Sequence, residues 1–264
     1  MEVIQLVNKA LTAALLAGIE IRNVYSLVDF NIQLKEDNTP VTIADEKANK
    51  AIFQVLKSTN LPILSEESIP ANYPERKNWE FFWMVDPLDG TKEFIKRNDE
   101  FTVNIALINR DKVIAGVVYA PVTGEMYVGI QEIGAWKLMN PDENCTFEFM
   151  QQAGEKLSGE NKSGEYIVTI SRSHQNAATE KYIENLRRDH QTVKTVSKGS
   201  SLKICMVAEG SANIYPKLGP TMEWDTAAGH AIAKAAGKNI FHTDRETEIS
   251  YNKENLLNPH FIVL

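Results

Sequence analysis

Hydrophobic and polar positions follow two different periods along the first part of the chain. Apolar residues recur at helical spacing over residues 3–28 and 43–58, and a polar stretch at 35–40 separates these segments. Two short apolar runs follow at 61–64 and 81–85, and each ends just before acidic residues. The pattern predicts two helices joined by a loop, then two buried strands that present carboxylates at their ends.

Beyond residue 100 the pattern changes from successive strands to strands that alternate with helices. Apolar runs over 101–138 are separated by turn signals and predict antiparallel hairpins. Residues 140–165 are polar and rich in Glu, Gly, Lys and Ser, which favours a boundary. The following pattern predicts strands at 166–170, 192–196 and 212–215 that alternate with helices at 177–188, 200–209 and 225–236. We therefore expect an N-terminal α+β domain over 1–155 and a C-terminal α/β domain over 156–264.

Composition and charge narrow the classes of function. A net charge of -7 and a pI near 5.4 argue against a nucleic-acid polymer or an electrostatic membrane anchor as partner. An anionic substrate would then need local positive charge from metal ions or lysines. Cys145 and Cys205 form neither a disulfide framework nor a metal motif, which favours a reducing cytoplasm. The apolar run at 11–19 is too short for a transmembrane helix, and the oligomeric state stays open.

The segment from Asp86 to Thr91 carries the clearest chemistry, with the sequence Asp-Pro-Leu-Asp-Gly-Thr. It follows an apolar strand and precedes a run that is compatible with a helix. Two carboxylates three positions apart would therefore stand on one tight turn at the end of a strand, where α/β proteins place ligands. The structural alternative is a Pro-Gly turn in which Asp89 or Thr91 caps a helix.

Further acidic residues stand at the ends of other predicted elements. Glu66 and Glu67 follow the strand at 61–64, and their structural alternative is a solvated surface pair. Asp45 and Asp225 open predicted helices, where each could be only an N-terminal cap. Magnesium prefers oxygen ligands in near-octahedral geometry and keeps part of its water, so a few such carboxylates suffice for a site.

Together these segments resemble the inositol monophosphatase superfamily of lithium-sensitive phosphatases. The shared features are the Glu-Glu pair, the Asp-Pro-x-Asp-Gly-Thr turn and a distant Trp-Asp before a helix, in that order. Within the superfamily, the chain is similar to the 3'(2'),5'-bisphosphate nucleotidases of the CysQ type over nearly its whole length, except 140–165. The segments that carry this similarity are 64–67 (LSEE), 86–96 (DPLDGTKEFIK), 100–107 (EFTVNIAL), 117–121 (VVYAP), 171–174 (SRSH), 199–203 (GSSLK) and 224–230 (WDTAAGH). The resemblance implies a layered α-β-α-β-α sandwich with its active site between the two halves.

The resemblance also implies a role for individual residues. The implied ligands of two or three magnesium ions are Glu66, Asp86, the Leu88 carbonyl, Asp89 and Asp225. Asp45 and Thr91, with the ligand Glu66, would activate the attacking water, and Gly90 and Thr91 would offer backbone N–H groups to the phosphate. The implied nucleotide contacts are Ser171, His174, Ser200, Lys203 and Asp225. From the residues alone, the preferred interpretations would be a surface or cap histidine for His174 and a solvated helix lysine for Lys203.

The activity implied by the resemblance is hydrolysis of adenosine 3',5'-bisphosphate to AMP and phosphate, which would support sulfate assimilation. The implied location is the cytoplasm, and some relatives are peripheral at the inner membrane. Two alternatives remain open. One is a phosphatase of the same fold that acts on inositol monophosphate or a sugar bisphosphate, and the other is a non-catalytic protein that binds cations or nucleotides. The presence of Asp45 and Thr91, which are needed to activate water, argues against the second.

Overall fold

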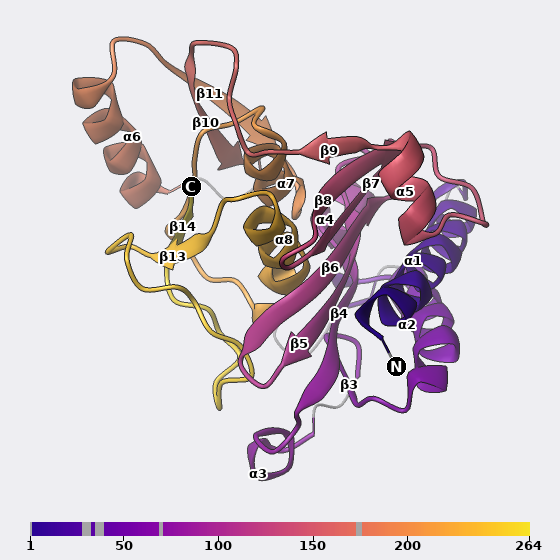
Figure 1. The fold of residues 1–264 in the computed structure, drawn as a ribbon. Helices are drawn as coiled ribbons and strands as arrows, with labels where there is room; N and C mark the ends of the chain where they lie inside the picture. Colours follow the sequence, from indigo (N-terminus) through magenta and orange to yellow (C-terminus); the bar gives the residue numbers. More distant parts are fainter. Residues whose placement is uncertain (1, 28–32, 35–39, 69–70, 173–175) are drawn as a thin grey trace.

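Seven strands in chain order build the largest sheet of the protein (Figure 1). The computed structural model describes residues 2–27, 33–34, 40–68, 71–172 and 176–264. The first strand pair of this sheet is parallel and the later pairs are antiparallel, which confirms the hairpins predicted over 101–138. The strands are β3 (Ile63–Ser65), β4 (Phe81–Asp89), β5 (Thr102–Asn109), β6 (Lys112–Ala120), β7 (Glu125–Ile130), β8 (Gly134–Met139) and β9 (Glu155–Leu157).

Helices cover both faces of this sheet because its strands are apolar on both sides. Along β4, Trp83 and Val85 belong to the core beneath the first two helices, whereas Phe82 and Met84 belong to the core on the opposite face. This alternation follows from the two-residue period of a strand. The helices of the described residues are α1 (Val3–Tyr25), α2 (Ile43–Leu56), the 3₁₀ helix η1 (Lys57–Thr59), α3 (Tyr73–Arg76), α4 (Thr91–Ile95), α5 (Phe147–Ala153), α6 (Ala177–Asp189), α7 (Leu202–Glu209) and α8 (Glu223–Ala235).

Two smaller sheets form a second sheet layer beyond α7 and α8 (Figure 1). Their strands are β10 (Tyr166–Ser171) and β11 (Val193–Lys198) in one sheet, and β12 (Tyr215–Lys217), β13 (Ile240–His242) and β14 (Phe261–Val263) in the other. Strands β10 and β11 are parallel, and a bridge between Val168 and Ile214 connects them to the antiparallel set β12-β14-β13. Helix α6 packs on the outer face through Ile183 and Leu186. The five layers confirm the sandwich that the resemblance implied.

Helix α1 confirms the helix predicted over 3–28, which contains the apolar run at 11–19. The helix has 23 residues and is long and apolar enough to cross a membrane by length and composition. Its apolar face nevertheless packs within the protein, and 56% of the apolar window is buried. Leu11, Ala14 and Ile21 are fully buried against the sheet and α2. The burial agrees with the predicted role of this helix as a core element.

The polar segment 140–165 contains regular structure that the hydrophobic pattern did not predict. It forms α5 and then β9, which pairs with β8 and completes the large sheet. The predicted boundary after residue 155 therefore falls within β9, and the division into two domains stays a prediction. The loop expected at 35–40 has its centre, 35–39, outside the described residues. Its flanks form a short antiparallel pair, β1 (Gln33–Leu34) and β2 (Pro40–Val41).

Two glycines allow α8 to lie directly on the sheet. A Cβ atom on Gly116 would stand 2.3 Å from the Ala228 carbonyl oxygen, and one on Gly129 would stand 2.5 Å from Ile232 Cα. Both contacts are with helix backbone, which cannot rotate away as a side chain can. The helix that carries Asp225 is therefore in backbone contact with strands β6 and β7.

Candidate active site

The parallel pair β3 and β4 places two of the predicted metal ligands side by side. Glu66 follows β3, and its N–H donates to the carbonyl oxygen of Val85 at 3.1 Å, one residue before Asp86. Helix α8 brings Asp225 to the same place. The carboxylates of Glu66, Asp86 and Asp225 each offer an oxygen within 4.8 Å of the other two. Residues far apart in sequence therefore meet in one carboxylate cluster.

The turn from Asp86 to Thr91 is an irregular strand end that leads into a short helix. The register with β5 shifts between Asp86 and Asp89, and the Leu88 N–H donates to Asp86 Oδ1 at 3.0 Å. Gly90 has a φ of +95°, which favours glycine, and α4 begins at the next residue. The strand predicted to end at residue 85 runs on to Asp89 in β4, because Asp86 and Asp89 still pair with β5.

Asp89 lies on the wall of a cavity that the three clustered carboxylates also line, but it is not part of the cluster itself. Its Oδ2 accepts hydrogen bonds from Ser200 Oγ at 2.6 Å, from the Ser201 N–H at 2.7 Å and from Asn104 Nδ2 at 3.3 Å. All three bonds end on one oxygen, so Oδ1 lies outside this network. Asn104 was missed as a site residue, although its place opposite Asp86 on β5 follows from the hairpin pattern.

Asp45 and Thr91 meet beside the cluster. Thr91 Oγ1 donates to Asp45 Oδ1 at 3.3 Å, while Asp45 Oδ2 accepts from both the N–H and the hydroxyl of Thr42 at 2.7 Å. The capping alternative considered for Asp45 is thus correct for one oxygen, and the other oxygen faces Thr91. The pKa of Asp45 is raised to about 7, chiefly by burial and with a smaller contribution from the charges of Glu67 and Glu66, while the hydrogen bonds from Thr42 lower it.

The carboxylate cluster has the electrostatics of a cation site. Burial raises the pKa of Asp86 well above its usual range, and repulsion from Glu66, Asp89 and Asp225 adds to this effect. Burial likewise raises the pKa of Asp225, with Asp89 and Glu66 as the repelling charges. Asp225 also caps α8, because its Oδ2 accepts the Met222 N–H at 2.8 Å. A set of closely spaced carboxylate oxygens fits a hard divalent cation, which would remove this repulsion.

A cavity of about 570 Å³ extends from the carboxylates to two buried lysines. Lys203 is 6% exposed, its Nζ donates to the Ser200 carbonyl oxygen at 2.5 Å, and it stands 5.5 Å from the centre of the Tyr215 ring. The interpretation of Lys203 as a solvated helix lysine is therefore wrong. Burial lowers its pKa to about 8, while the charge of Asp89 opposes this change.

Lys217 is the second buried lysine on the cavity wall and was not predicted from the sequence. It ends β12, is 8% exposed, and has its pKa lowered by burial against the opposing charges of Asp225 and Asp89. A lysine two residues after the predicted strand at 212–215 was the available signal.

The remaining predicted contacts lie on or near the same cavity. Gly90, Thr91, Ser171 and Ser200 all line it. His174 lies outside the described residues, so its proposed contact with the nucleotide stays a prediction.

Comparisons with known proteins agree over nearly the full length of the chain. The profile described as the inositol monophosphatase family matches residues 3–261. The 3'(2'),5'-bisphosphate nucleotidase CysQ of Escherichia coli (strain K12) is 46% identical over 251 residues, 94% of each chain. The crystal structure of CysQ from Bacteroides thetaiotaomicron, with 47% identity, superposes with a TM-score of 0.89 over 97% of this chain and 95% of that one. A more distant fold relative is the extragenic suppressor protein suhB from Bartonella henselae, with a TM-score of 0.75, 24% identity and coverage of 98% and 93%.

Proposed function

Because the chain belongs to the inositol monophosphatase family, we propose that it is a magnesium-dependent 3'(2'),5'-bisphosphate nucleotidase. Its reaction is the hydrolysis of adenosine 3',5'-bisphosphate to AMP and phosphate in the cytoplasm, where it supports sulfate assimilation. The observation that carries this proposal is the distribution of charge around one cavity. Carboxylates gather at one end, and the buried Lys203 and Lys217 stand on its wall. A substrate with two phosphate groups matches this arrangement.

Glu66, Asp86, Asp89, Asp225 and the Leu88 carbonyl are the proposed ligands of two or three magnesium ions. When bound, these ions neutralise the carboxylates, polarise the scissile phosphate and stabilise the leaving oxygen. The Asn104 amide and the Ser200–Ser201 pair hold one oxygen of Asp89 in place. Ligands that are fixed in this way lose little conformational freedom when a cation binds.

Asp45 is the proposed proton acceptor for the attacking water. Its Oδ2 is held by Thr42, and its Oδ1 faces the hydroxyl of Thr91. A water that donates to Thr91 Oγ1 can pass its proton through that hydroxyl to Asp45. A pKa of about 7 suits this role, because the carboxyl can take up and release a proton near neutral pH.

Lys203 and Lys217 are proposed to bind the phosphate that is not hydrolysed, with Ser171, Ser200 and His174 beside the nucleoside. Burial strengthens the attraction of both ammonium groups for an anion, because little water competes in the cavity. The lysines come from α7 and β12, whereas most proposed metal ligands come from the turn after β3 and the end of β4. Substrate recognition and hydrolysis therefore draw on different elements.

Phosphate release from three substrates tests the proposal. Adenosine 3',5'-bisphosphate, inositol 1-phosphate and fructose 1,6-bisphosphate are assayed with magnesium, without magnesium and with added lithium. We expect magnesium-dependent, lithium-inhibited turnover of the nucleotide, with kcat/KM well above that for the other two. Comparable turnover of inositol 1-phosphate would contradict the nucleotide specificity, and turnover of none would favour a protein that only binds cations or nucleotides.

A further inference from the structure

Glu100 joins two parts of the molecule beside the cavity. It lies between α4 and β5, and its carboxylate forms a bidentate pair with Arg172, from Nε at 2.7 Å and from Nη2 at 2.9 Å. The same carboxylate accepts the Gly199 N–H at 2.8 Å. Arg172 also donates to the Ser197 carbonyl oxygen at 3.1 Å. One side chain from the large-sheet region therefore holds the ends of both β10 and β11.

Gly199 fits closely against the backbone of Glu100. A Cβ atom at Gly199 would lie 2.5 Å from the Glu100 carbonyl oxygen and 2.8 Å from Glu100 Cβ. The next residue, Ser200, has a φ of +54°, which is uncommon for a residue other than glycine. The chain then turns so that Ser200 Oγ and the Ser201 N–H both point at Asp89 Oδ2. Glu100 contacts this segment where the turn begins, through the Gly199 N–H.

We propose that Glu100 is a positioning residue for Asp89. By holding Gly199 and Arg172, it fixes the segment from Gly199 to Ser201, whose donors orient the Asp89 carboxylate through Oδ2 and keep Oδ1 available to a divalent cation. Glu100 itself touches neither substrate nor metal. The inference rests on the proposed role of Asp89 as a metal ligand, and it adds the residue that prepares that ligand for binding.

Magnesium affinity measured without substrate tests this role. Isothermal titration of Mg²⁺ into metal-free protein gives the dissociation constant for the unaltered chain, for Glu100→Ala and for Glu100→Gln. Loss of a group that orients a metal ligand weakens binding by about tenfold to a hundredfold, so Glu100→Ala is expected to raise the Kd by about tenfold or more. Glu100→Gln keeps an oxygen for the Gly199 N–H and is expected to recover much of the affinity.

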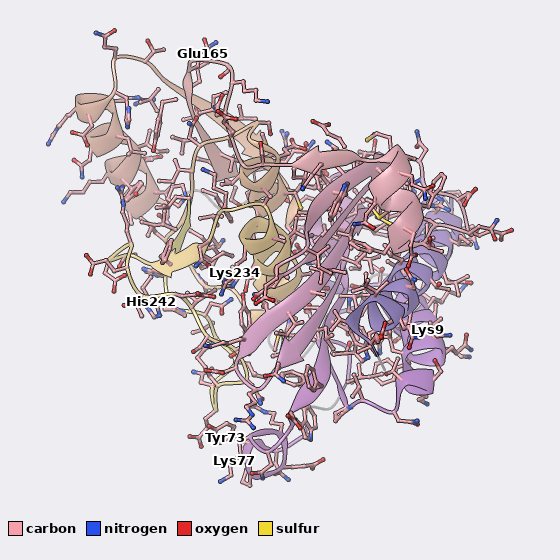
Figure 2. All side chains as sticks on the ribbon, in the orientation of Figure 1. Lys9, Tyr73, Lys77, Glu165, Lys234 and His242 are labelled. Atoms are coloured by element: carbon pink, nitrogen blue, oxygen red, sulfur yellow. The ribbon has the colours of Figure 1, made fainter. Side chains whose placement is uncertain are left out.

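A matched control removes a carboxylate from the other end of the same strand pair. Glu165 pairs with Lys194 at 2.5 Å, is not among the residues that line the cavity, and lies at the top of the molecule in Figure 2. Glu165→Ala should bind magnesium as the unaltered protein does. Gly199→Ala disturbs the same contact as Glu100→Ala. The double variant should therefore lose less magnesium-binding free energy than the sum of the losses in the two single variants.

The outcomes separate this inference from the proposed function. A folded Glu100→Ala protein with unchanged magnesium affinity would overturn the positioning role while Asp89 remained a ligand. If Asp89→Asn also bound magnesium with unchanged affinity, the proposed ligand itself would be wrong. Thermal unfolding of each metal-free variant shows whether it is folded. If Glu100→Ala is not folded, Gly199→Ala provides the test, because it disturbs the same contact and unchanged magnesium affinity in it would overturn the positioning role.

Discussion

His230 provides a pH-dependent contribution to stability that can be worked out from its surroundings. It is fully buried on α8, with Nδ1 2.9 Å from the Tyr251 hydroxyl and Nε2 2.6 Å from Asn239 Oδ1. Burial lowers its pKa from 6.5 to about 4, although the bond to Asn239 and the charge of Glu248 favour the protonated ring. The Lys234 ammonium opposes protonation. The folded protein therefore keeps a neutral imidazole in mildly acidic solution.

The direction of the effect follows from comparing the folded and unfolded chains. In the unfolded chain the ring takes up a proton near pH 6.5, whereas in the folded protein it does so only near pH 4. The contribution of neutral His230 to the free energy of unfolding is fully present above the pKa of the unfolded chain. It is lost as the pH falls from that value through the pKa of the folded protein. Each pH unit between the two pKa values of His230 corresponds to about 1.4 kcal/mol, so the free energy of unfolding falls by about 3 kcal/mol in total.

Urea unfolding at about pH 7 and about pH 4.5 measures this loss in the unaltered protein and in His230→Gln. Carboxylates titrate in both proteins, so the informative quantity is the difference between their losses. We expect the unaltered protein to lose about 2 to 3 kcal/mol more than His230→Gln over this interval. The partly exposed His242 provides a control, because His242→Gln should keep the full pH dependence. Equal losses in His230→Gln and the unaltered protein would refute the reasoning.

Four further predictions concern the site and its support. Asp89→Asn should lower kcat by about a hundredfold or more while the thermal unfolding temperature changes little, because it removes a proposed metal ligand at a cavity wall. A variant that kept most of its activity would exclude Asp89 as a metal ligand. Lys203→Ala should raise KM by about tenfold or more for adenosine 3',5'-bisphosphate and much less for a substrate without the second phosphate, and equal changes would contradict its proposed contact. The rate should rise with pH through about 7 as Asp45 ionises, and a profile with no such rise would remove it as the base. Gly129→Ala should lower the free energy of unfolding by about 1 to 3 kcal/mol in urea, because its Cβ would meet the backbone of α8.

The sequence predicted the elements with strong periodicity and the acidic residues at their ends. Strand ends could be recognised because one apolar run stops two residues before Glu66 and another stops directly before Asp86. The burial of Lys203 was harder to predict, since a lysine on a helix is usually solvated. Helix α7 buries residues on nearly all sides, including Leu202, Ile204 and Cys205, so its lysine has no solvent-exposed side to occupy.

Elements whose structure depends on distant partners could not be predicted locally. The polar residues before Leu157 become β9 only because β8 offers a free edge for pairing. Asp45 and Asp225 were correctly seen as possible helix caps, and the structure gives each of them a capping bond. Their gathering with Glu66 and Thr91 depends on how α2 and α8 pack on the sheet. That packing cannot be derived from one segment alone.

The close seating of α8 on Gly116 and Gly129 determines which parts of the cavity can move. Asp225 stands at the start of a helix that cannot slide toward β6 and β7 without a collision of main chains. Together with the turn after β3 and the end of β4, this helix makes a fixed floor for the carboxylates. Widening of the cavity to admit a substrate or release a product must therefore come from the side of β10, which carries Ser171. The carboxylates would keep their spacing while that side opens and closes.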